Sequence, residues 1–165
     1  MWLSSWWGKG TRRGTLEHLT IGMKYKVAMA VHRIVIDHEK LVYVIVADRP
    51  LRYRLGRSPI AYIGETKTGA HRVASSLANK ANSVLASQWG VRHLGVLLVT
   101  CRPLQRVKTW KKLETALLLC FRERYGEWPK ENKQGKKAAT DEFSYFRKVR
   151  VMNILKELED FTKAA

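Results

Sequence analysis

The sequence predicts an α+β domain in which helices cover a small, mainly antiparallel β-sheet. Three observations lead to this class. Short β-branched runs lie in the middle of the chain, and longer runs with helical spacing alternate with them or follow them. Turn-forming Pro and Gly residues separate these runs. The chain has 165 residues, of which 45% are hydrophobic, so it has the size and the apolar content of one ordinary domain.

Three segments have the length and composition of strands in this sheet. Residues 41–47 (LVYVIVA) are a short β-branched and aromatic run, which is typical of a buried strand. Residues 60–64 are the next strand, and the arginine-rich stretch before them contains turn-forming Pro and Gly residues. These two strands are expected to form a hairpin with a long, arginine-rich connection. Residues 93–101 (HLGVLLVTC) are the third strand, which stops before Pro103.

Three segments are expected to be helical. The first runs from about residue 69 to residue 86 and has Val, Leu and Ala on one side. Thr109 is the expected N-cap of a long helix that continues to about residue 125. Residues 127–139 are polar, contain Pro and Gly, and are expected to be a loop. The last helix is expected to start near Asp141 and to carry an apolar face.

The chain is expected to contain one domain with an extension at each end. Residues 1–22 are a basic, tryptophan-rich arm without a clear hydrophobic period. Residues 23–140 are the domain, with its core at 41–135. Residues 141–165 are a C-terminal helix that packs on it. Residues 23–36 fit either a strand or a helix, and a strand is favoured because Val and Ile dominate their second half.

The charge balance points to a polyanionic partner. Lys and Arg number 31 against 14 acidic residues, which gives a formal net charge of +17. Self-repulsion of this size opposes folding, so the charge is expected to serve a partner, and a nucleic acid is favoured. An acidic membrane surface is the rival partner. No run of about 18 apolar residues could span a bilayer, and the first ten residues do not resemble a secretory signal, so no membrane association is expected.

The two cysteines indicate a reducing environment. Cys101 and Cys120 alone cannot build a disulfide framework or a four-ligand zinc site. Cys120 lies in an apolar helical run and is expected to be a small core residue. An intracellular location, in the cytoplasm or on the nucleoid, fits this composition.

Two strand tyrosines and one arginine are the first candidates for chemistry. Tyr43 and Tyr62 are expected on adjacent antiparallel strands, and the alternative is ordinary cross-strand aromatic packing. Arg72 shares a helical face with Ser76 and Asn79, so this face is polar. Its guanidinium could grip a phosphate with two donors, and the alternative is a solvated surface arginine.

An acid and an amide complete the set. Glu114 precedes Leu117, Leu118 and Phe121 on one helical face, where a carboxylate needs a cationic partner such as an arginine or a metal. The alternative is an acid placed near a helix N-terminus by the helix dipole. Asn132 lies in a lysine-rich loop that either contacts a phosphate backbone or is simply solvated.

Taken together, these residues resemble the GIY-YIG nuclease family. The second family element is present as Tyr-Ile-Gly at 62–64, and the first is reduced to the tyrosine of Leu-Val-Tyr at 41–43. Arg72 follows the glycine by eight residues, similar to the spacing of the family's invariant arginine. Glu114 resembles the metal-binding glutamate and Asn132 the late asparagine. The resemblance covers about residues 41–135, and the expected order of elements also matches this fold.

The resemblance implies a metal-dependent endonuclease that hydrolyses DNA phosphodiester bonds by a one-metal mechanism. Glu114 would hold one Mg²⁺, with Mn²⁺ as a possible substitute. Arg72 would clamp the scissile phosphate, and Tyr43, with Tyr62, would activate or position the attacking water. For Tyr43 to act as a base, a cationic neighbour would have to lower its pKa. Many family members have a His or Tyr one turn after the arginine, whereas this chain has Ser76, so the general base is left open. Two nearby basic residues are substitutes or phosphate contacts: Lys67 and His71.

Six basic residues and one asparagine, on two segments, are expected to bind the nucleic-acid backbone beside this site. They are Arg52, Arg54, Arg57, Asn132, Lys133, Lys136 and Lys137. The main alternative is a catalytically weak or inactive nucleic-acid-binding module, or a scaffold of a nucleoprotein complex. The sequence leaves open DNA or RNA as the substrate, and a monomer or a homodimer as the assembly.

Overall fold

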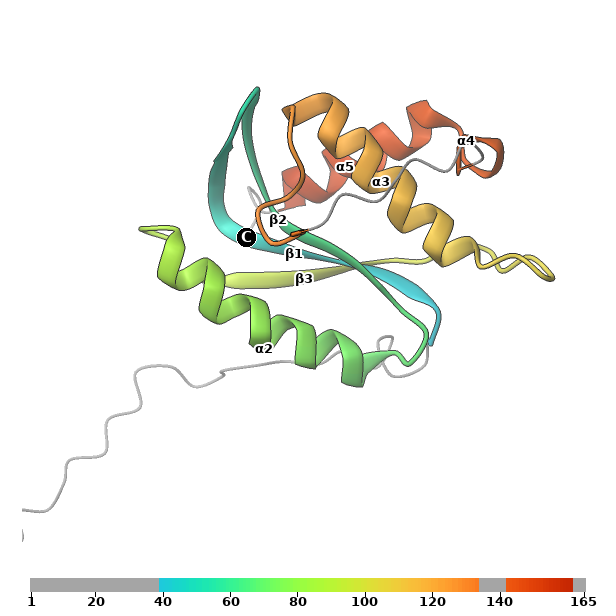
Figure 1. Ribbon diagram of the computed structural model, residues 1–165, viewed down its shortest axis with the longest axis horizontal. Coiled ribbons are helices and arrows are strands. Elements are labelled where there is room, and N and C mark those ends of the chain that lie inside the picture. The colour runs from blue at the N-terminus through green and yellow to red at the C-terminus, as the bar shows by residue number, and fades with distance from the viewer. Residues whose placement is uncertain (1–38, 134–141, 162–165) are drawn as a thin grey trace, which may run out of the picture. The chain divides into compact units, whose positions relative to one another are not determined.

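A three-stranded antiparallel sheet forms the centre of the computed structural model, which describes residues 39–133 and 142–161 (Figure 1). The strands are β1 (Leu41–Tyr53), β2 (Gly56–Thr66) and β3 (Leu94–Val99), in the order β2-β1-β3. Both pairings of the central strand β1 are antiparallel. The predicted α+β class with a small antiparallel sheet is therefore confirmed.

The β1–β2 hairpin is longer than the sequence predicted, and its turn is tight. Pairing continues to Tyr53↔Gly56, with Arg52 opposite Arg57, so only two residues connect the strands. The expected long, arginine-rich connection is wrong, because the irregularity in the register between Val46 and Leu51 absorbs the turn-like residues near Pro50. A bulge can accommodate a proline, which has no backbone N–H to donate, and it bends the strand. The arginines therefore extend the hairpin.

Helices cover both faces of the sheet, as Figure 1 shows. Helix α2 (Ala70–Ser87) lies on one face, and α3 (Thr109–Tyr125) and α5 (Lys148–Phe161) lie on the other. The long α3 has the predicted bounds, but Lys108 is its cap residue and Thr109 makes no capping hydrogen bond. The expected last helix is divided into α5 and a short α4 (Glu142–Tyr145).

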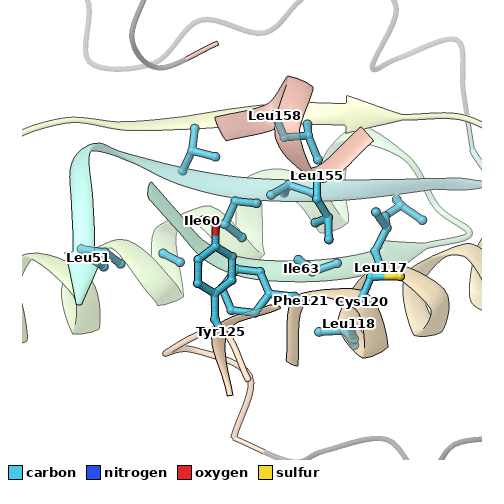
Figure 2. Close-up of a cluster of buried hydrophobic side chains, with 14 of the residues drawn as sticks. Leu51, Ile60, Ile63, Leu117, Leu118, Cys120, Phe121, Tyr125, Leu155 and Leu158 are labelled. Atoms are coloured by element: carbon cyan, nitrogen blue, oxygen red, sulfur yellow. The ribbon is translucent and has the colours of Figure 1, made fainter. Parts of the chain in front are cut away.

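The alternation of β1 separates two hydrophobic clusters. Val42 and Val44 face α3 and α5 in the larger cluster, whereas Leu41 and Tyr43 pack with Val73 of α2 in the smaller one. In the larger cluster, Figure 2 shows side chains of α3 and α5 meeting strand residues in the core. The labelled members are Leu51, Ile60, Ile63, Leu117, Leu118, Cys120, Phe121, Tyr125, Leu155 and Leu158. The predicted core position of Cys120 is confirmed.

A buried carboxylate ties α5 to the rest of the domain. Glu159 accepts hydrogen bonds from the Ser58 hydroxyl (2.9 Å) and from the Tyr125 hydroxyl (2.5 Å). Arg124 also lies 3.3 Å from its second oxygen. Because a buried carboxylate is costly without partners, these contacts fix the registry of α5 on β2 and α3.

Several predictions fall outside the described residues. These are the arm at 1–22, the strand at 23–36, and the lysines Lys136 and Lys137. In the described ranges, none of the helices has the length and hydropathy that crossing a bilayer requires.

Candidate functional site

The two candidate tyrosines lie together on the α2 face of the sheet. Tyr43 is buried on the central strand, and Tyr62 is half-buried on the edge strand β2. Their ring centroids are 5.9 Å apart, with an interplanar angle of 42°. In the ladder Tyr43 pairs with Gly64, and Tyr62 pairs with Ile45, so the two rings are diagonal neighbours.

Gly64 makes this arrangement possible because it has no side chain. A Cβ atom there would come within 2.5 Å of Tyr62 Cε1 and 2.8 Å of the Tyr43 hydroxyl. The Tyr43 hydroxyl in turn donates a hydrogen bond to Ser76 Oγ of α2, at 2.7 Å. The glycine of the Tyr-Ile-Gly segment is therefore required by the packing of both tyrosines.

Charged groups from α2 and α3 affect the pKa of the Tyr62 hydroxyl. Burial raises the pKa of its hydroxyl well above the usual value, and the neighbouring Tyr43 and the Glu114 carboxylate raise it further. Arg72 acts in the opposite direction, but its effect is smaller. The surroundings of Tyr62 therefore do not lower its pKa, as a role as a base would require. Its protonated hydroxyl is suited to orienting a water or a phosphate oxygen by hydrogen bonding.

A polar stripe on α2 faces the tyrosine pair. Arg72, Ser76 and Lys80 follow one another at intervals of four residues, so they share one face of the helix. Arg72 is exposed, whereas Ser76 is buried against Tyr43. The Lys80 ammonium lies 5.1 Å from the centre of the Tyr62 ring. Sequence reasoning missed Lys80, although its spacing from Arg72 places it on the same helical face.

Lys80 also holds the segment after α3 against α2. It donates to the backbone carbonyl of Glu131 (3.1 Å) and lies 3.7 Å from its carboxylate. Ser83 donates to the same carboxylate at 2.8 Å. Glu131 is buried, and these contacts with Lys80 and Ser83 compensate the desolvation cost of its carboxylate. Glu131 was not predicted from the sequence, because it lies in a polar, lysine-rich segment.

Asn132 binds the middle residue of the Tyr-Ile-Gly segment through its amide. Its Oδ1 accepts from the Ile63 N–H at 3.0 Å, and its Nδ2 donates to the Ile63 carbonyl at 2.8 Å. The backbone N–H of Glu131 donates to the Ala61 carbonyl next to it, at 3.0 Å. Asn132 is therefore not simply solvated: both ends of its amide are engaged by the backbone of β2, so it orders the Tyr-Ile-Gly segment.

Glu114 lies in the second turn of α3 and is almost fully buried. The start of this helix is fixed by Glu65, which directly follows the Tyr-Ile-Gly segment. Trp110 donates its indole N–H to Glu65 at 3.0 Å, and the Lys111 ammonium lies 3.5 Å from the same carboxylate. These contacts place Glu114 one turn beyond the anchored end. The sequence analysis did not identify Glu65 or Trp110 as supports.

The donor set suits a hard divalent cation held by a single carboxylate. Within 39–133 and 142–161, no group of three or more His, Cys, Asp or Glu side chains could form a closed metal site. Mg²⁺ commonly keeps several waters and takes one or two carboxylates together with substrate phosphate oxygens. Glu114 is the candidate carboxylate that would hold such an ion, with waters and phosphate oxygens as its other ligands.

Three of the other predicted site residues are exposed at the surface. Lys67, in the turn between β2 and α2, and His71, in the first turn of α2, are both exposed. Lys133 is exposed next to the Asn132 clamp.

The predicted arginines Arg52, Arg54 and Arg57 lie at the tip of the hairpin. Arg52 is nine residues along β1 from Tyr43, which corresponds to about 30 Å of extended strand. This tip contacts the end of α3: the backbone N–H of Arg54 donates to Glu127 at 2.9 Å, and that of Leu55 to the Tyr125 carbonyl at 3.0 Å.

The chain was compared with protein-family models, with curated proteins and with solved structures, and none of the three comparisons found a match.

Proposed function

We propose that this protein is a metal-dependent endonuclease that hydrolyses DNA phosphodiester bonds by a GIY-YIG-type mechanism. The observation that carries the proposal is the tyrosine pair: the rings of Tyr43 and Tyr62 lie 5.9 Å apart, and the Tyr43 hydroxyl contacts Ser76 on the helix that also carries Arg72. An anchored carboxylate, a cation and two tyrosine hydroxyls are the groups that phosphodiester hydrolysis requires in one place. The family resemblance at 41–43 and 62–64 adds support, because these segments carry the two tyrosines.

The proposed roles follow from burial and position. Arg72 is exposed on α2, and its planar guanidinium binds the non-bridging oxygens of the scissile phosphate. Tyr62 and Tyr43 orient the attacking water, which loses one proton as its oxygen bonds to phosphorus. The leaving sugar oxygen takes a proton from solvent water as its bond to phosphorus breaks. When bound to Glu114, Mg²⁺ or Mn²⁺ supplies positive charge to the phosphate and the leaving oxygen.

The residue that accepts the proton of the attacking water is sought at the exposed N-terminus of α2. Tyr62 is disfavoured as a base, because its pKa is raised. Lys67 and His71 are both exposed beside the N-terminus of α2, and His71 directly precedes Arg72. Of the two, histidine is the side chain that most often serves as a general base, so we assign the proton to His71.

Plasmid nicking tests the proposal. The protein is incubated with supercoiled plasmid and Mg²⁺ or Mn²⁺, with EDTA as the metal-free arm. Glu114→Gln and Arg72→Ala are expected to lower the nicking rate at least about 100-fold, while binding to a fluorescent DNA duplex in EDTA changes little. Glu157→Gln and Arg150→Ala are matched controls, because these two residues form an exposed ion pair on α5. Nicking that is unchanged in both site variants would overturn the assignment.

A second function is supported by a specific contact. The Tyr43 hydroxyl already donates to Ser76, at the position where many family members have a His or Tyr. A protein with this arrangement could keep the basic surface and lose the chemistry, as a nucleic-acid-binding module or a scaffold of a nucleoprotein complex. The same assay separates the two, since a binding module would retain salt-dependent DNA or RNA binding without any metal-dependent nicking.

A further inference from the structure

Trp89 is the most unusual residue on the surface of the described chain. Its side chain is 100% exposed, and it lies in the turn that follows α2. Leu85, one helical turn earlier, is also exposed. Tryptophan usually buries most of its large apolar surface, so a fully exposed indole is an unfavourable placement for the isolated protein. Such a residue commonly serves a binding partner.

The turn that presents Trp89 is held in place by hydrogen bonds. The Asp48 carboxylate accepts from the Arg92 backbone N–H at 3.2 Å and lies 3.3 Å from Nδ1 of His93. The Asp48 N–H donates to the His93 carbonyl at 3.0 Å, and Val91 N–H donates to the Gln88 carbonyl at 3.2 Å. The indole is therefore carried by an anchored turn, which lowers the entropy cost of using it for binding.

Positive charge flanks the indole. Gly90 follows Trp89 with a φ of 90°, and a Cβ there would come within 2.5 Å of the Arg49 guanidinium. Arg49 thus packs over the turn from the β1 side, and the exposed Arg92 follows Trp89 by three residues. An aromatic face between cations matches a nucleotide, whose base stacks and whose phosphates are anionic.

We propose that Trp89 is a stacking site for an unpaired nucleic-acid base, with Arg49 and Arg92 on the adjoining phosphates. A base inside a duplex has no free face, so the site selects single-stranded or branched segments. Trp89 follows Arg72 by 17 residues, which corresponds to about 25 Å along the helix axis. The stacking site therefore lies beyond the opposite end of α2 from Arg72.

This inference rests on the nucleic-acid partner of the proposed function but not on cleavage. Its test therefore uses binding in EDTA, measured by fluorescence anisotropy with a labelled 20-nucleotide single strand and with the matching blunt duplex. Trp89→Ala is expected to weaken single-strand binding about tenfold and duplex binding less than about twofold. Trp89→Phe is expected to recover most of the loss, because phenylalanine also stacks. Val149→Ala, at another exposed apolar residue, is the matched control.

A second measurement isolates the arginines. The double variant Arg49→Gln/Arg92→Gln is expected to reduce the slope of log affinity against log salt for the single strand by about 1.4, which is about 0.7 per phosphate contact. A slope that does not change would overturn their assignment to phosphates.

Three results would overturn the stacking site itself. They are unchanged single-strand binding in Trp89→Ala, equal losses for the single strand and the duplex, and a change in oligomeric state on a sizing column without a change in nucleic-acid binding. The last result would make the patch a protein interface. If the parent nicks plasmid while Trp89→Ala binds like the parent, only this inference fails. If the parent binds no nucleic acid, both proposals fail.

Discussion

Tyr43 lies directly opposite Gly64 in the β1–β2 ladder, and its hydroxyl occupies the space that any side chain on Gly64 would need. The same hydroxyl is hydrogen-bonded to Ser76. One residue without a side chain thus brings the central strand, the edge strand and α2 into contact at the candidate site.

Gly64→Ala is expected to destabilise the protein by about 2 kcal/mol, because the new methyl group overlaps both tyrosine rings. Tyr43 cannot yield easily, since it is buried and hydrogen-bonded. Urea unfolding followed by circular dichroism measures the change. Gly95→Ala is the matched control in β3, where a Cβ meets only Val46 at 3.4 Å. Equal effects of the two substitutions would contradict this account of Gly64.

The Tyr43–Ser76 hydrogen bond is expected to show energetic coupling. Ser76→Ala leaves the buried Tyr43 hydroxyl without its acceptor and should cost about 1–3 kcal/mol of unfolding free energy. Adding Tyr43→Phe removes the hydroxyl that has lost its acceptor, so the double variant should recover part of this loss. A double-mutant cycle from urea unfolding measures the coupling, and strictly additive losses would show that the bond contributes nothing.

Alkaline pH is expected to weaken the link between α3 and α5. Burial, followed by the hydrogen bond to Glu159, raises the pKa of Tyr125 to about 12. An unfolded tyrosine loses its proton near pH 10, so between about pH 10 and pH 12 the unfolded state binds fewer protons. The contribution of Tyr125 is complete below pH 10 and is lost as the pH rises through 12.

Urea midpoints at pH 8, 10 and 11 test this prediction. Tyr125→Phe should reduce the fall in stability between pH 8 and pH 11, after allowance for its lower starting stability. Tyr145→Phe, at an exposed tyrosine, is the control. An identical fall in the parent and in Tyr125→Phe would contradict the role of this hydroxyl.

The hairpin arginines are expected to contribute to the salt dependence of DNA binding without affecting chemistry. The variant Arg52→Gln/Arg54→Gln/Arg57→Gln should lower the salt slope for duplex DNA by up to about 2.7, which is about 0.9 per arginine. Nicking at saturating protein should be retained, because these residues lie far along the hairpin from Tyr43. A triple substitution to Gln of exposed cations, at Arg147 just before α5 and at Arg150 and Lys156 on it, removes the same charge elsewhere. Equal slopes for the two variants would show that binding depends on net charge alone.

The regular elements were predictable because their patterns are local. The β-branched run at 41–47 and the apolar face of 109–125 determine strand and helix from neighbouring residues. The tight hairpin turn was not predictable, because bulges near Pro50 let the strands pair beyond the turn-forming residues. Local propensity contains no information about such register changes.

The candidate site was predictable in part. The resemblance identified Tyr43, Tyr62 and Arg72 by their order, and the structure brings the two rings together on the face of α2. The supports of the site were missed, because Glu65 and Trp110 meet only after α3 packs on the sheet. The direction of the pKa shift at Tyr62 was also missed, since it depends on burial.

The clamp of Asn132 on Ile63 also covers part of a sheet edge. Strand β2 is at the edge of the described sheet, where backbone donors and acceptors can recruit another chain into an intermolecular sheet. Asn132 and the Glu131 backbone occupy the groups of Ile63 and Ala61 that such a chain would use. The residues that order the tyrosines therefore also keep this edge from pairing with another chain. A variant that loosens the segment is expected to expose the backbone groups of β2 before the domain unfolds.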